Sequence, residues 1–393
     1  MPLRTRPLRP TNPASPPTSS RQGHRPARRM RLALVVVAGA LVFPGRALSA
    51  LPPPPLVTGS AATATVPFPT VAVDLPHTAW VVQDEDSAPL VDAGTLSRWL
   101  TYLAIMLMVG SVTFGAITRR AFRRSGTPSD ELEAWYRRAG LRWGLIGSVM
   151  FLLAAAGRLY AQVVAFLFPG DPLTLADFGT IVFDTGWGER WLIQVGAGLS
   201  AAVGFALARR GAPGGGPVAV AGAIATAVTL PLTGHALAAS WHWSITLPLQ
   251  ALHVLAGATW LGSLLLLVLV VFGAGADAER RERTVADLIA VFSPVAMVGV
   301  AGAVVMGTVL SVSYVGSWAG LWQTAYGRTL LVKIGLLGLT ALLGVYNWRR
   351  LRPRLGTPGS AGRLFQSARL ELLVGALLLV ATAILVALPA PHV

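Results

Sequence analysis

The sequence contains no cysteine, and lysine occurs once, as Lys333, among 32 basic residues. The absence of cysteine excludes disulfides, thiolate metal sites and cysteine nucleophiles. Charged residues make up 12% of the chain, whereas soluble domains typically carry about 25%. Walker, HExxH and CxxC motifs are missing, and no GxGxxG lies in a strand–helix context. An ordinary soluble enzyme and an ATP-driven pump are therefore both excluded.

Apolar residues dominate instead. They form 53% of the 393 residues, and the mean hydropathy is +0.60. The net charge of +15 would suit a nucleic-acid binder, but nine basic residues and no acids lie within residues 1–50. The remainder has 23 basic residues against 17 acids, and 18 of these basic residues lie in four short loops. We therefore predict an all-α, polytopic protein of the lipid bilayer with no nucleic-acid partner.

The N-terminal region divides into two predicted segments. Residues 1–50 combine an Arg-rich, Pro-rich leader with a short apolar run and a small-residue end, which is typical of a signal peptide. A retained anchor is the alternative, and Met30 is an alternative start. Residues 51–94 are rich in proline and acids, which indicates an extracytoplasmic linker.

Residues 95–393 form the predicted membrane domain of eight helices. The expected spans are 95–118, 142–168, 190–208, 217–238, 246–272, 289–316, 326–347 and 369–388. Arginine is concentrated in the loops 119–142, 209–210, 280–283 and 349–369, whereas the intervening loops carry no basic residue. Basic loops favour the cytoplasm, so we expect a multi-pass protein of the plasma membrane whose mature termini are both extracytoplasmic.

A sequence echo links the two halves of this domain. Gly188 precedes Gln194 by six residues, as Gly327 precedes Lys333, and Gly110-Ser111 is matched by Gly262-Ser263. Four spans separate the members of each pair. This pattern is compatible with two parallel four-helix repeats, a plan found in some transporters.

Three candidate histidine ligands lie toward the side of the membrane that faces away from the basic loops. His235 ends the fourth span, His242 lies in the following loop and His253 lies about two turns into the fifth span. Imidazole and thioether groups bind copper, and Met106, Met108 and Met306 lie in the first and sixth spans. The histidines and methionines could instead serve only in helix packing.

Two other features leave alternatives open. Paired histidines at matched depth would also suit a b-type haem in an electron-transfer protein. Charged groups within spans need a partner or a wet cavity: Arg158 has none that the sequence identifies, Lys333 is either structural or binds an anion, and Glu371 has Arg369 and its basic loop nearby.

Several segments in order resemble the CopD-type copper resistance membrane proteins. They are Arg98–Tyr102 with Gly110, Gly234–Ala236, Leu252–Gly262, Tyr326–Lys333, Arg369–Glu371 and Leu388–Pro391. The resemblance implies a non-enzymatic inner-membrane protein that transports copper, by uptake from the extracytoplasmic side, and contributes to copper resistance. It implies copper as the cargo at His235, His253, His242, Met306, Met106 and Met108. Residues 51–94 show no fused CopC-type domain, so we expect copper to come either from a separate partner of CopC type or directly from solution.

Overall fold

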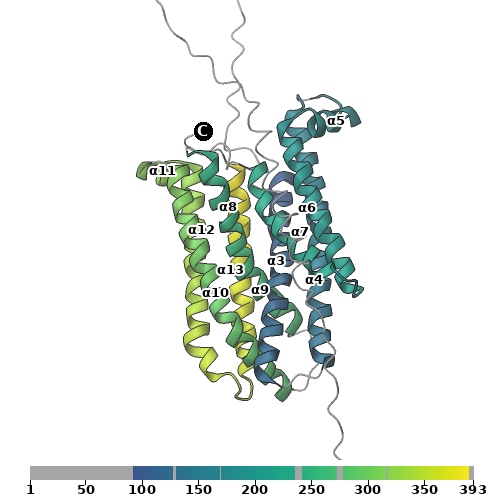
Figure 1. Ribbon diagram of the computed structural model, residues 1–393. Coiled ribbons are helices and arrows are strands. Elements are labelled where there is room, and N and C mark those ends of the chain that lie inside the picture. The colour runs from purple at the N-terminus through teal and green to yellow at the C-terminus, as the bar shows by residue number, and fades with distance from the viewer. Residues whose placement is uncertain are drawn as a thin grey trace, which may run out of the picture.

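The computed structural model describes residues 92–126, 130–168, 170–234, 241–271, 278–315 and 317–388. The predicted signal peptide, nearly all of the linker, and His235 lie outside these residues. The described part is all-α without strands, and eight of its helices are long and apolar enough to cross a membrane. Both predictions are therefore confirmed (Figure 1).

The spans follow one another in antiparallel order along the bundle (Figure 1). The helical elements in chain order are α3 (Ala93–Ser125), α4 (Asp130–Phe166), α5 (Leu175–Phe183), α6 (Gly186–Arg209), α7 (Gly215–Thr229), η1 (Leu230–Thr233), α8 (Trp243–Gly257), η3 (Ala258–Gly262), α9 (Ser263–Leu266), η4 (Leu267–Val271), α10 (Ala278–Val315), α11 (Trp318–Gln323), α12 (Ala325–Tyr346), η5 (Asn347–Leu351), η6 (Arg352–Arg354) and α13 (Ser360–Ala387). The short helices α5 and α11 precede α6 and α12 at the same end of the bundle.

Several helices are longer than their apolar stretches. The α4, α10 and α13 helices begin about nine to twelve residues before the predicted spans, and α3 begins at Ala93, capped by the Asp92 carboxylate. Arginine is a good helix former with a long apolar stem, so basic loop segments continue the helices beyond the bilayer. Hydropathy marks only the part that lies in lipid.

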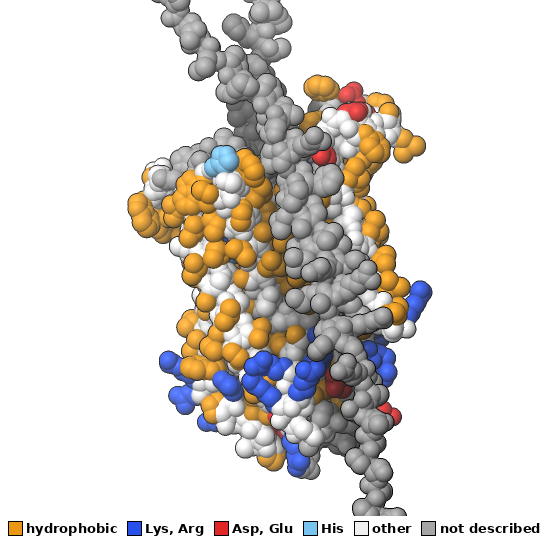
Figure 2. Space-filling view, in the orientation of Figure 1, with side chains coloured by type: hydrophobic (Ala, Val, Ile, Leu, Met, Phe, Trp, Pro, Cys, Tyr) orange, Lys and Arg blue, Asp and Glu red, His pale blue; other side chains and the backbone are white. Residues whose placement is uncertain are grey.

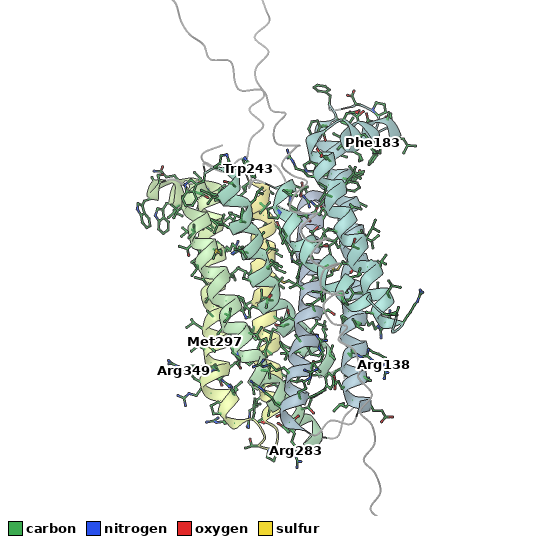
Figure 3. The ribbon with its side chains drawn as sticks, in the orientation of Figure 1. Arg138, Phe183, Trp243, Arg283, Met297 and Arg349 are labelled. Carbon is green, nitrogen blue, oxygen red and sulfur yellow. The ribbon has the colours of Figure 1, made fainter. Side chains whose placement is uncertain are left out.

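Charge is segregated between the two ends of the bundle. Lys and Arg side chains gather at one end (Figure 2), where Arg138, Arg283 and Arg349 lie, whereas Phe183 and Trp243 lie at the other (Figure 3). We call these the basic end and the opposite end. The first span starts and the last span finishes at the opposite end.

Equivalent contacts recur in the two halves. Gly110 of α3 lies against the backbone of Gly262 in η3, so the two members of the sequence echo meet each other. A Cβ at Gly147 would lie 3.0 Å from the Ala104 carbonyl, and a Cβ at Gly299 would lie 3.0 Å from the Ala256 carbonyl. These residues are separated by the same offset as Gly110 and Gly262.

The starts of α6 and α12 match in the same way. Thr185 accepts a hydrogen bond from the Gly188 amide, and Thr324 accepts one from the Gly327 amide. Gly188 packs on the end of α5, and Gly327 packs on the end of α11. The repeated contacts support the two parallel repeats that the sequence echo indicates.

Candidate metal site

A cavity of about 260 Å³ lies in the half of the bundle near the opposite end. Residues from α3, α4, α8, α10, α12 and α13 line it, together with η1 and η3. We call it the His253 cavity, because His253 is the histidine among its described lining residues. Met106 also faces it, so an imidazole and a thioether share one cavity in the membrane-spanning part.

The His253 ring is held in one orientation. Its Nδ1 lies 2.8 Å from the carbonyl oxygen of Ala303 on α10. A carbonyl can only accept, so Nδ1 carries the proton and donates it. The second nitrogen, Nε2, then keeps its lone pair for a metal, since a backbone carbonyl on the far nitrogen is a common way of fixing a histidine ligand.

A glycine makes room for this ring. A Cβ at Gly307 would lie 2.9 Å from Cε1 and 3.2 Å from Nδ1 of His253. Any side chain at this position would therefore push the imidazole away from Ala303. Gly307 and Ala303 are one helical turn apart on α10, so the same face of that helix supplies both the space and the hydrogen-bond acceptor.

The other predicted ligands have different surroundings. His242 is exposed at the start of α8, and its Nδ1 lies 2.8 Å from the Ser244 hydroxyl. Met108 is fully buried among apolar side chains, and Met306 is partly buried but does not line the cavity. His235 lies outside the described residues. The structure thus brings together His253 and Met106 and keeps His242, Met108 and Met306 apart from them.

Arg158 finds partners that the sequence could not identify. Its guanidinium donates to Gln194 Oε1 at 3.0 Å and to the Thr233 hydroxyl at 2.7 Å. The Thr233 carbonyl accepts a third hydrogen bond at 3.3 Å. All three acceptors are neutral, so the guanidinium is fixed in place but its charge is not balanced. Arg158 also lines the His253 cavity.

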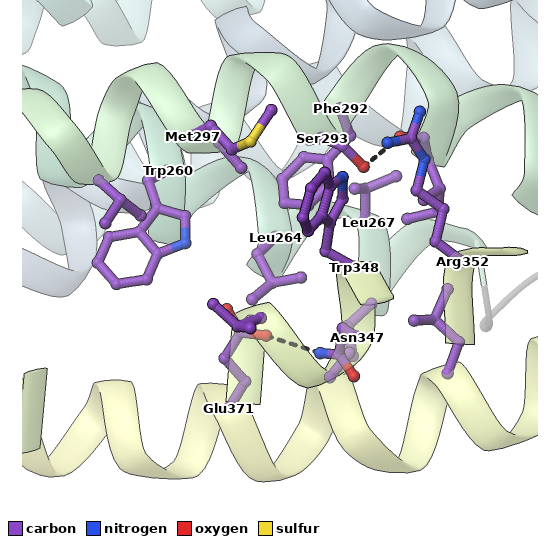
Figure 4. Close-up of a pocket in the computed structure, with 18 of the residues that line it drawn as sticks. Trp260, Leu264, Leu267, Phe292, Ser293, Met297, Asn347, Trp348, Arg352 and Glu371 are labelled. Carbon is purple, nitrogen blue, oxygen red and sulfur yellow. Dashed lines mark hydrogen bonds between the residues drawn. The ribbon is translucent and has the colours of Figure 1, made fainter. Parts of the chain in front are cut away.

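A second cavity, of about 310 Å³, lies in the half of the bundle near the basic end. Its lining is mostly apolar, and Glu371 provides a buried carboxylate (Figure 4). Asn347 Nδ2 donates to Glu371 Oε2 at 2.9 Å, and the Trp260 side chain forms a second hydrogen bond to this carboxylate. We call it the Glu371 cavity.

Glu371 does not pair with Arg369, the charged residue that lies nearest to it in the sequence. Its hydrogen-bond partners are Asn347 and Trp260, whereas the Arg369 guanidinium lies over the Phe365 ring, 5.5 Å from its centroid. Residues two apart on a helix point in different directions, so Arg369 and Glu371 do not share a face. Asn347 is a polar residue at the inner end of the predicted seventh span, next to the stronger charge signal of Arg349 and Arg350.

Trp260 lies between the two cavities. It lines both of them, and only 4% of its surface is exposed. It belongs to the π-helical segment η3, and π turns of this kind often occur at functional sites. The two cavities therefore follow one another along the bundle with one indole ring between them.

The haem alternative gains no support from this arrangement. His253 is the histidine that lines a cavity within the described residues. His242 lies on the surface. Among the described residues there is thus no pair of histidines facing a common space, which bis-histidine ligation requires.

Two family models match most of the membrane domain. The model "Copper resistance protein D-like, N-terminal domain" matches residues 90–243, and "Copper resistance protein D" matches residues 286–385. Together they cover well over half of the chain. The chain belongs to the copper resistance protein D family. In this CopD-type chain, residues from both matched regions line the His253 cavity.

One relative adds to the family assignment. The copper transport protein CutJ of Bacillus subtilis (strain 168) is 27% identical over 160 residues, which is 40% of this chain and 28% of that protein. This CopD-type chain therefore aligns with well under half of that relative's length. No solved structure matches this chain.

Proposed function

We propose that this copper resistance membrane protein carries copper across the plasma membrane, by uptake from the extracytoplasmic side. It acts as a transporter without enzymatic chemistry. The supporting observation is the succession of two cavities along the bundle, which meet at Trp260. The first holds His253 and Met106, and the second holds Glu371, so a path through them would run between nitrogen, sulfur and oxygen donors.

The first cavity would capture the ion. His253 Nε2 and the Met106 thioether suit copper, because imidazole binds Cu(II) and Cu(I) and thioethers favour Cu(I). His235 follows Gly234, a lining residue, in the sequence and stays a proposed ligand. Met108 and Met306 would serve only in side-chain packing, and His242 would be only a surface residue.

The second cavity would receive the ion on its way to the cytoplasm. An ion that leaves His253 moves into a cavity where a carboxylate is available. Trp260 must turn aside for the passage, and its π-helical segment departs from regular α-helical geometry, as such segments often do at functional sites. Movement of the Trp260 side chain would open and close the path, so that the two cavities are never open to both sides of the membrane at the same time.

The proposed orientation rests on the distribution of arginine. Basic segments stay in the cytoplasm, so the basic end would face inward and the His253 cavity would face the extracytoplasmic side. The mature termini would both be extracytoplasmic. Copper would arrive from solution or from a separate CopC-type protein.

Cellular copper content tests this function. A deletion strain complemented with the wild-type gene should contain more copper than the deletion strain, and His253→Ala should abolish the difference. Met106→Leu, which keeps the volume but removes the sulfur, should reduce it.

His242→Ala and Met108→Leu are matched controls, since they make the same chemical changes outside the cavity. Both should retain wild-type copper content at equal protein level. Uptake is contradicted when the deletion strain contains more copper than the complemented one, and the ligand assignment is contradicted when His253→Ala accumulates copper normally.

A further inference from the structure

The His253 cavity carries an excess of positive charge. Arg98, Arg158 and Lys333 line it, and no acidic residue does so within the described part of the chain. Arg98 has a partial counter-charge, because its guanidinium lies near Gly94 and Asp92 at the start of α3. Among the described residues Arg158 and Lys333 have none, so two cations face one cavity without an acidic side chain.

The charge of Lys333 is compensated even less than that of Arg158. Arg158 at least donates to Gln194 and Thr233. The Lys333 ammonium forms no hydrogen bond or ion pair with any residue that the structure describes, although it lies close enough to His253 to act on it electrostatically. An ammonium inside a membrane-spanning segment normally pairs with an anion or reaches water.

The charges also bear on what the cavity can hold. Two unit charges 10 Å apart repel each other by roughly 1.7 kcal/mol at an effective dielectric constant of 20. A cation entering beside Arg158 and Lys333 meets this repulsion from both, whereas an anion is attracted by both. The volume of about 260 Å³ leaves room for a small anion together with water.

Polar side chains around the cavity would solvate such an ion. The tyrosines Tyr102, Tyr314 and Tyr326 line it, whereas the hydroxyl protons of Ser311 and Thr382 are already donated to the carbonyls of Gly307 and Leu378. Hydroxyl groups can donate to an anion and need no charge of their own. The cavity therefore combines fixed positive charges with neutral donors, which is the chemistry of an anion site.

We propose that the His253 cavity binds a small inorganic anion between Lys333 and Arg158. The anion balances these two cations that line the cavity, and it is a ligand distinct from the copper cargo. This inference does not depend on copper transport, because the charges are present whether or not a metal passes. It explains how a lysine is tolerated beside the histidine that we assign to copper.

Chloride is a suitable probe. The full chain is purified into nanodiscs of neutral lipid, treated with a metal chelator, and studied by ³⁵Cl NMR at constant ionic strength with gluconate as the balancing anion. Chloride in exchange with a protein site gives a broadened line. We expect the wild-type protein to broaden the line beyond empty nanodiscs, and Lys333→Met to reduce this excess several-fold.

Two variants make the test specific. Arg328→Gln removes a positive charge from the same helix, but Arg328 is exposed and does not line the cavity, so the broadening should be unchanged. Lys333→Arg keeps the charge and should keep most of the broadening.

The proposal is overturned when the wild-type protein gives no excess broadening. This outcome is measured on the wild-type protein alone, so it does not depend on whether a variant folds. It is also overturned when Lys333→Met and Arg328→Gln lower the excess equally. Because the sample contains no copper, neither outcome bears on the copper content of cells.

Discussion

At the scale of single residues, Glu371 supplies the buried carboxylate of the Glu371 cavity. Its exposed fraction is 5%, and its carboxylate receives hydrogen bonds from Asn347 and Trp260. The Oδ1 atom of Asn347 is buried without a partner. The Asn347 amide therefore donates to Glu371 with one atom and leaves the other unsatisfied.

This asymmetry makes the outcome of two substitutions different. In Glu371→Leu, the donors on Asn347 and Trp260 both lose their acceptor, and an unsatisfied buried donor costs about 1–3 kcal/mol. In Glu371→Gln, the Asn347 side chain can rotate so that its unpaired Oδ1 accepts from the new amide. We expect thermal unfolding in nanodiscs to show a clearly lower midpoint for Glu371→Leu and a small change for Glu371→Gln.

Copper accumulation then separates charge from stability. Glu371→Gln keeps the fold but removes the negative charge of the second cavity, so we expect reduced cellular copper. Glu189→Gln is the matched control, because Glu189 is exposed at the start of α6 and lines neither cavity. Wild-type copper content in Glu371→Gln cells would contradict a role for the carboxylate in the path.

At the same scale, the sequence predicted the residue types of the site better than their grouping. His253 and Met106 were both candidates and lie in one cavity, but Met108 was an equal candidate from the same helix and lies in the core. Two residues along a helix correspond to a rotation of about 200°. Nothing in the apolar run around them indicated which face would meet the cavity.

At the scale of helices, glycines decide how closely the two halves approach. Gly110 and Gly262 lie in direct backbone contact where α3 crosses η3, and Gly262 also packs against the backbone at Met106. Small residues at helix crossings are the usual way for membrane helices to approach closely. Because Met106 lines the His253 cavity, this crossing also positions one wall of the site.

Adding one methyl group at this crossing should separate the helices. In Gly110→Ala the Cβ would overlap backbone atoms of Gly262, which cannot move aside as a side chain can. We expect a loss of about 1–3 kcal/mol in the free energy of unfolding, the usual cost of overpacking, measured by reversible denaturation of the purified protein.

Gly115→Ala provides the control within α3. A Cβ at Gly115 meets nothing within 4 Å, and alanine is favoured over glycine in a helix by roughly 0.5–1 kcal/mol. This variant should be as stable as the wild type or slightly more so. Equal destabilisation of both variants would contradict the crossing as the source of the cost, because only the Cβ at Gly110 meets backbone atoms.

The element scale is also where the sequence was most informative. Apolar runs predicted eight spans, and the structure has eight candidate spans in the described residues. The positions of Thr185 and Thr324 as caps, and the contacts of Gly147 and Gly299, were not predicted. These equivalences depend on three-dimensional contacts between helices, which the spacing of glycines in a Gly-rich chain can only suggest.

At the scale of the whole molecule, the arginines and the cavities lie along one axis. The charge gathers at the basic end (Figure 2), and the two cavities lie one after the other between the ends. The proposed direction of copper movement therefore depends on which end faces the cytoplasm. The absence of cysteine makes this orientation directly measurable, since any introduced cysteine is the sole thiol in the chain.

Two single-cysteine variants report the two ends. Asp171→Cys lies in the loop before α5 at the opposite end, and Pro358→Cys lies in the turn before α13 at the basic end; both positions are exposed. A membrane-impermeant maleimide added to intact cells or spheroplasts should label Asp171→Cys and leave Pro358→Cys unmodified until the membrane is permeabilised. The reverse pattern would place the Glu371 cavity outside. The His253 cavity would then receive copper from the cytoplasm, and the same pair of cavities would be arranged for export.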